Sequence, residues 1–314
     1  MTEPAPRPDL DLLPEWIHGA RTPQADTDPP LQVHHVAPHT VILRQAKRVS
    51  GEAPFLYLLL GHDRALLLDT GDVADPSVCP VRQAVDSVLE GWLAKNPRAA
   101  GSPAYELVVA HTHGHRDHVR GDPQFADRPH TTVVDRELAA VQAFFGFTGW
   151  PAEVVTLDLG GRVLEVVGIP GHHAASIGVH DSWTGLLLTG DTVYPGRLYV
   201  EDMPAFVDSL ERLVALTETR PISAVLGCHL EMSRRPGRDF PLGARYQPDE
   251  VPLPMTVAQL VRLRDRSRDV AGRPGVHRFD DVVIYNGRCT AGMLRLAAGG
   301  AIARLRRGLA SRRA

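Results

Sequence analysis

A short polar stretch, HTHGHRDHVRG at residues 111–121, constrains this chain more than any other part of it. It places four histidines and one aspartate within eight consecutive positions, directly after the apolar run YELVVA at 105–110. A loop that leaves a buried strand is held by a rigid scaffold while its side chains stay open to solvent. Because neutral imidazole and carboxylate are good ligands for divalent cations, the stretch predicts a metal site rather than a solvated polar loop.

Three further side chains that could bind a metal each follow an apolar run of the sequence. A carboxylate at the end of a buried run is costly unless a cation or hydrogen bonds meet it. The three residues are His172 in IPGHHAAS, Asp191 in LLLTGDTVY and His229 in VLGCHLE.

The spacing inside the loop favours two metals. His113 and His115 are separated by one residue, so on an extended loop both rings can face one ion. Asp117 and His118 follow immediately and point elsewhere, which suits a second ion close to the first. With the three later residues the chain offers seven ligands, enough for two metals with room for water.

Composition excludes several classes of protein. The net charge of −3 argues against nucleic acid or an anionic membrane as a partner, and no stretch is long and apolar enough to span a bilayer. The opening MTEPAPRPDLDLLPEW lacks the basic start and apolar run of a secretory signal, and the three cysteines form no CxxC pair. We therefore predict a cytoplasmic protein with a small-molecule substrate, and the sequence leaves the oligomeric state open.

The order of short apolar runs predicts an α+β fold. Strand-like runs occur in two batches flanked by helical patterns, which indicates two sheets packed face to face with helices outside. We expect a loosely ordered lead-in, a central domain, and an extension that holds helices and a substrate lid. Their ranges are 1–30, 31–230 and 231–314. The last twenty residues carry six arginines and no acids, which is typical of a solvated helix packed on the domain.

Four motifs together resemble one known family. HGHRDH at 113–118, PGH at 170–172, GDT at 190–192 and GCH at 227–229 look like the ordered ligand motifs of the metallo-β-lactamase fold superfamily. The resemblance covers roughly residues 35–230 and implies an αββα sandwich of two mixed β-sheets with the site at one edge. Through LLLDTG at 66–71, it also implies that Asp69 holds the ligand loop.

The resemblance also implies how the ligands divide between two metals. Zinc is the expected metal, although Mn²⁺ and Fe²⁺ accept the same donors. The assignment is His113, His115 and His172 to the first ion, Asp117, His118 and His229 to the second, and Asp191 to both. His111 and His173 fall outside this frame as neighbours, and Cys228 is expected to be a buried structural thiol.

A pair of such ions predicts hydrolysis by a shared hydroxide, because each metal lowers the pKa of bound water towards about 7. Asp117 is expected to relay a proton, and Tyr194 to donate to the developing oxyanion. The D-x-x-Y spacing of Asp191 and Tyr194 resembles the lactonase branch of the superfamily.

The predicted substrate is a carboxylic ester, lactone or thioester. A true β-lactamase is not expected, because the chain shows no export signal and the resemblance places a different residue at position 191 in those enzymes. Two alternatives remain open at this point. One is an oxidoreductase like the mononuclear iron persulfide dioxygenases, and the other is a phosphodiesterase or nuclease.

Overall fold

The computed structural model describes residues 9–101 and 105–287, and every structural statement below concerns these residues. The predicted basic tail and Cys289 lie outside them. Within the described ranges, no helix has both the length and the apolar composition needed to cross a lipid bilayer.

The first sheet is mixed and has six strands in sequence order. The first four strands pair with one another in antiparallel fashion, and the last two run parallel to the fourth. Its strands are β1 (Leu31–Ala37), β2 (Thr40–Gln45), β3 (Phe55–Leu60), β4 (Arg64–Leu68), β5 (Glu106–Ala110) and β6 (Thr131–Val133).

The second sheet is also mixed, with five strands in the order β12-β10-β9-β8-β7. Only the β10–β12 pair is parallel. Its strands are β7 (Val154–Asp158), β8 (Val163–Gly168), β9 (Ile177–Asp181), β10 (Leu186–Gly190) and β12 (Ala224–Gly227).

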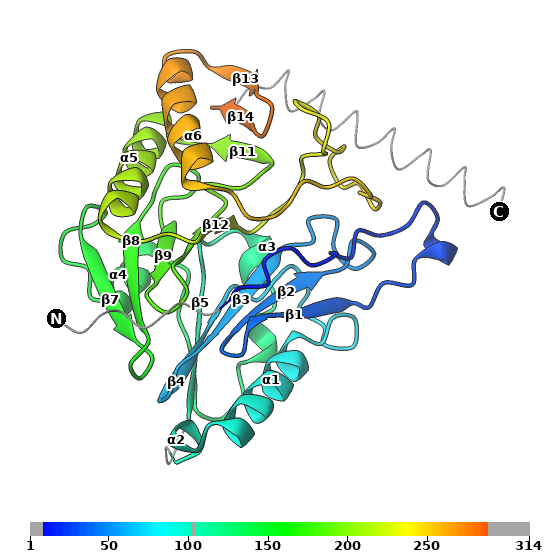
Figure 1. The fold of residues 1–314 in the computed structure, drawn as a ribbon, viewed down its shortest axis with the longest axis vertical. Helices are drawn as coiled ribbons and strands as arrows, with labels where there is room; N and C mark the ends of the chain where they lie inside the picture. Colours follow the sequence, from blue (N-terminus) through cyan, green and yellow to red (C-terminus); the bar gives the residue numbers. More distant parts are fainter. Residues whose placement is uncertain (1–8, 102–104, 288–314) are drawn as a thin grey trace.

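Helices cover the outer faces of both sheets (Figure 1). Helix α1 (Val81–Lys95) packs on the first sheet, while α5 (Met203–Thr219) and α6 (Val257–Val270) pack on the second. The remaining helices are short: α2 (Pro97–Ala100), α3 (Arg116–Val119), α4 (Leu138–Phe145) and the 3-10 turns Pro23–Ala25 and Asp122–Gln124. The layers confirm the predicted αββα sandwich.

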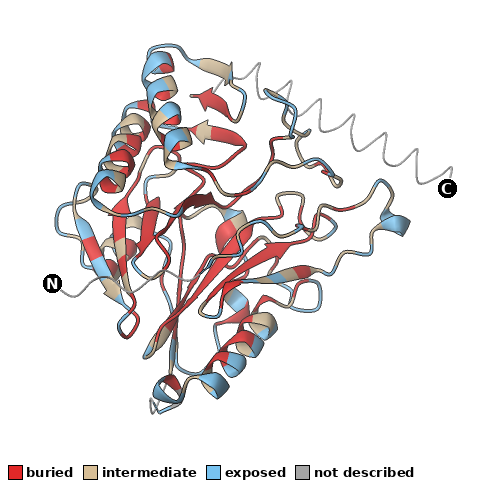
Figure 2. Cartoon of the chain, viewed as in Figure 1, coloured by how far each residue is buried: buried red, intermediate tan, exposed pale blue. Residues whose placement is uncertain are grey.

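Inner strands of the two sheets, such as β2, β3, β9 and β10, are buried on both faces (Figure 2). Successive side chains of a strand point to opposite faces. Thus Leu59 and Leu66 join the core between the sheets, whereas Leu58 and Leu67 pack under α1. A strand with two buried faces must be apolar along its whole length, which accounts for runs such as FLYLLL.

A third sheet, of three strands, was not expected from the sequence. It has the order β11-β14-β13 and joins β11 (Arg197–Val200) to β13 (Gly275–Arg278) and β14 (Val283–Asn286). The parallel β11–β14 pair ties the C-terminal extension to the central domain. A buried ion pair between Arg44 and Glu250, at 2.6 Å, fastens the extension to β2 as well.

The lead-in carries little regular structure but contributes to the core. Trp16 is buried, and its ring meets that of Phe55 edge to face with centroids 5.0 Å apart. Leu13, three residues earlier, is largely exposed. The division into the three predicted ranges, and the lid role of the extension, stay predictions.

Candidate metal centre

The predicted ligands all follow strands that end at one edge of the sandwich. Strand β5 ends at Ala110 and leads into the histidine loop, β8 ends at Gly168 before His172, and β10 ends at Gly190 before Asp191. Strand β12 ends at Gly227, two residues before His229. The two sheets therefore deliver side chains from distant parts of the sequence to one place.

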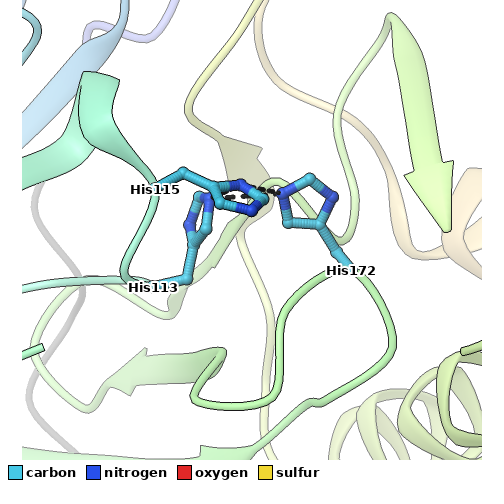
Figure 3. Close-up of side chains that lie close together, drawn as sticks. All are labelled: His113, His115 and His172. Carbon is cyan, nitrogen blue, oxygen red and sulfur yellow. Dashed lines mark hydrogen bonds between the residues drawn. The ribbon is translucent and has the colours of Figure 1, made fainter. Parts of the chain in front are cut away.

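The first group of side chains consists of three histidines, whose rings turn toward one another (Figure 3). Nδ1 of His115 lies 2.9 Å from Nε2 of His113 and 3.0 Å from Nε2 of His172. The Nδ1 of His172 lies 2.7 Å from the carbonyl oxygen of Tyr199 and donates to it. That contact fixes the tautomer, so Nε2 of His172 presents a lone pair to the group.

The second group adds two carboxylates to two histidines: Asp117, His118, Asp191 and His229. Nε2 of His229 lies 3.2 Å from Oδ2 of Asp117 and 3.4 Å from Oδ2 of Asp191. Asp191 Oδ2 also lies 3.7 Å from Nε2 of His172, in the first group. Asp191 therefore stands between the two groups.

Electrostatics in the second group favour a buried cation. Burial opposes ionisation of Asp191, but the imidazoles of His229 and His118 outweigh it and hold the pKa of Asp191 well below its usual range. Asp191 Oδ1 is buried and accepts no hydrogen bond among the described residues. Asp191 Oδ1 lies 3.5 Å from Nε2 of His118, and a carboxylate oxygen among imidazole nitrogens suits a divalent metal.

The two groups differ in their protonation. Burial lowers the pKa of His172 to about 4 and that of His113 well below its usual range, so both rings are neutral at neutral pH. Burial also disfavours charge on His118 and His229, but nearby carboxylates outweigh it and raise both pKa values. A metal entering the second group must therefore displace protons.

Asp69 holds the ligand loop, as the resemblance implied. Its Oδ1 accepts from the backbone N–H of Thr112 at 2.8 Å, and its Oδ2 accepts from the Thr112 hydroxyl at 2.8 Å. Oδ2 also accepts from Nδ1 of His118 at 2.9 Å, which leaves Nε2 of that ring facing the second group. Asp69 is fully buried, so these contacts are shielded from water.

Replacing Asp69 by asparagine is expected to weaken metal binding by about 10–100-fold, because an amide cannot accept all three hydrogen bonds. Competition with a chromophoric chelator measures the change. Asp75→Asn is the matched control, since among the described residues the Asp75 side chain bonds only the exposed Ser77. Equal affinity in the Asp69 and Asp75 variants would contradict the role of Asp69.

Comparison with known proteins gives relatives among thioester hydrolases. The chain is 31% identical over 172 residues to a hydroxyacylglutathione hydrolase from Synechococcus, covering 52% of this chain and 60% of the relative. It is 28% identical over 218 residues to the acyl-coenzyme A thioesterase MBLAC2 of Gallus gallus, covering 58% and 74%. These relatives support the resemblance to the metallo-β-lactamase fold superfamily that the ligand motifs indicate.

Solved structures give a distant likeness. A metallo-β-lactamase from Pontibacter korlensis is 23% identical to this chain in sequence and superposes on it with a TM-score of 0.44. The match covers 63% of this chain and 91% of that one. No family model matches the chain.

The structure brings together all seven residues that the superfamily resemblance assigned to metals. They fall into the same two sets, with Asp191 next to both. Their service as metal ligands stays a prediction. His111 is buried outside both groups, with Nε2 3.2 Å from Oδ2 of Asp122. Burial and Asp69 raise the pKa of the Cys228 thiol, which fits the expected structural role.

Tyr194 departs from the oxyanion role expected for it. Its side chain is buried, and its hydroxyl donates to the carbonyl oxygen of Arg197. A second contact, at 3.4 Å, joins the hydroxyl to Glu231. Within the described residues the hydroxyl hydrogen-bonds none of the seven side chains, although the Tyr194 ring lies 5.6 Å from that of His229 between centroids. The geometry therefore corrects the predicted role to a structural one.

Sequence reasoning passed over Glu52 and placed His173 only as a neighbour of the site. The carbonyl oxygen of Glu52 lies 3.4 Å from Nδ1 of His229, and only tertiary folding brings this loop near the ligand. His173 packs against the rings of His113 and His115. Its adjacency to His172 was visible in the sequence, but not the side to which its ring turns.

Proposed function

We propose that this chain is a metal-dependent hydrolase of thioesters, in the glyoxalase II-like branch of the superfamily. The observation that carries the proposal is the pair of ligand groups joined by Asp191 at one edge of the sandwich. The names of the relatives supply the substrate class, since hydroxyacylglutathione and acyl-coenzyme A are both thioesters. These relatives do not favour the oxidoreductase and nuclease alternatives.

The residues present fit two divalent cations. The first group would hold one ion through three imidazole nitrogens, and the second would hold another through two imidazoles and two carboxylates. Zinc is the metal we propose, and manganese or iron would accept the same donors. When bound, such a pair supplies Lewis acidity and lowers the pKa of water enough for attack at neutral pH.

The chain itself provides the proton carrier. Asp117 is half-buried at the open side of the second group, with Oδ2 3.2 Å from Nε2 of His229. The imidazoles of His118 and His229 outweigh burial and hold the pKa of Asp117 below its usual range, so it enters the reaction ionised. Asp117 accepts a proton from the attacking water and returns it to the departing sulfur.

A substrate panel tests the proposal. Purified protein is assayed with an S-acylglutathione, acyl-coenzyme A esters, lactones, oxygen esters and bis-p-nitrophenyl phosphate. We expect kcat/KM to be highest for a thioester. Activity on the phosphate diester alone would overturn the proposal, and oxygen uptake with a persulfide by a chain holding one iron would support the oxidoreductase instead.

A further inference from the structure

His173 stands beside the first group without belonging to it. Its ring centroid lies 5.0 Å from that of His115 and 5.7 Å from that of His113. The side chain is half-buried, so one side of the ring packs against the site and another meets solvent. His173 therefore lies next to the first group and keeps contact with solvent.

Backbone contacts fix which nitrogen of His173 carries the proton. The N–H of Ala175 donates to Nδ1 of His173 at 3.1 Å. Because a backbone N–H can only donate, Nδ1 must accept and cannot carry a proton. The proton is therefore on Nε2, and within the described residues this N–H makes no hydrogen bond.

Because Gly114 has no side chain, there is room beside it for the His173 ring. A Cβ at position 114 would lie 3.1 Å from Cε1 and 3.2 Å from Nε2 of His173. The ring therefore lies against the backbone between the two loop histidines of the first group. This packing, together with the Ala175 contact, holds the Nε2–H bond in place before a substrate arrives.

We propose that His173 donates a hydrogen bond from Nε2 to the carbonyl oxygen of the bound thioester, and so stabilises the oxyanion. This role rests on the proposed thioesterase function. It supplies the donor that Tyr194 does not, since the Tyr194 hydroxyl is held by Arg197 and Glu231. His173 touches the reacting atoms and is therefore a catalytic residue.

The proton of His173 stays on its nitrogen throughout the reaction. Water loses a proton to Asp117 as its oxygen bonds the carbonyl carbon, and the carbonyl electron pair moves onto the oxygen that His173 faces. When the electron pair on this oxygen re-forms the carbonyl double bond, the carbon–sulfur bond breaks and the bonding electrons leave with the sulfur. The thiolate takes the proton from Asp117, so the products are a carboxylic acid and a thiol.

Two variants of His173 separate hydrogen bonding from packing. His173→Phe keeps a ring without the N–H, and we expect kcat to fall by about 100-fold. KM should change much less, because the contact strengthens only as the oxyanion forms. His173→Gln restores an N–H donor of similar reach and should recover most of kcat. His277→Phe, on β13, is the control for the same substitution away from the site.

Metal content is measured by elemental analysis for every variant and should equal that of the wild type. An unchanged kcat in His173→Phe, or equal losses in the Phe and Gln variants, would overturn the proposal. Metal loss in His173→Phe would overturn it too, since His173 would then act on the ligands. A wild-type chain that is inactive on every thioester would instead overturn the proposed function, and this role with it.

Discussion

An Asp191→Asn variant is expected to lose about 1,000-fold or more in kcat/KM, a loss of at least about 4 kcal/mol in transition-state stabilisation. Asp191 is the side chain that stands between the two groups, 3.4 Å from Nε2 of His229 and 3.7 Å from Nε2 of His172. Asparagine has nearly the same shape but no negative charge. Metal in the second group should therefore be lost first.

Elemental analysis alongside the thioester assay measures both effects. Asp127→Asn is the matched control, because Asp127 is exposed and, in the described part of the chain, pairs only with Arg82 at the surface. The control should keep its metal and its rate. A variant at Asp191 that keeps wild-type activity with full metal content would show that the carboxylate is not a ligand.

The second large effect concerns stability rather than catalysis. Arg162 and Asp181 form a fully buried ion pair in the second sheet, with Nη2 2.6 Å from Oδ2. The Arg162 guanidinium also donates to the carbonyl oxygen of Leu60 at 3.0 Å and to the Thr40 hydroxyl at 2.7 Å. One side chain thus satisfies polar groups of both sheets.

Replacing Arg162 by methionine is expected to lower the free energy of unfolding by about 3–5 kcal/mol, because it leaves the Asp181 carboxylate buried without its cationic partner. Among the described residues, only the Thr184 hydroxyl and the Trp183 N–H would still be bonded to it. Urea unfolding of metal-free protein measures this without a contribution from bound metal. The double variant Arg162→Met/Asp181→Leu should recover most of the loss. Arg220→Met breaks a more exposed pair with Glu165 and should cost only about 0–1 kcal/mol.

The same pair predicts a dependence on pH. Burial raises the pKa of Asp181, but Arg162 outweighs it and holds the pKa below the usual range. A carboxyl whose pKa is depressed in the folded state contributes stability above its unfolded pKa of about 4 and loses it as the pH falls further. Wild-type protein should therefore lose this contribution in acid. Equal stability of Arg162→Met and wild type at neutral pH would contradict the account.

Local patterns allowed much of the fold to be predicted. The apolar run FLYLLL coincides with β3, and two of the helical patterns that flank the strand-like runs, at 203–216 and 256–269 of the sequence, correspond to α5 and α6. Helix α6 begins after a capping box of Thr256 and Gln259, a signal contained in the sequence itself. The ligand order was equally visible, because each ligand follows an apolar run by a few residues.

Features that depend on distant partners were not predictable in this way. Strand β13 has only partly buried or exposed residues and pairs with β14, so its own four residues carry no strand signal. The Tyr194 hydroxyl is bound by Arg197 and Glu231, and Glu231 comes from the extension. The contact between Arg162 and Asp181 joins two strand ends whose spacing suggests no pairing.

The central claim is that two divalent cations in these groups activate water for attack on a thioester. Protein stripped with a chelator is titrated with zinc while bound metal and thioester hydrolysis are followed together. The account predicts saturation at about two ions per chain, with activity rising as the ions bind. Full thioester hydrolysis by the stripped protein, or zinc binding that is unchanged when His113, Asp191 and His229 are replaced, would contradict it.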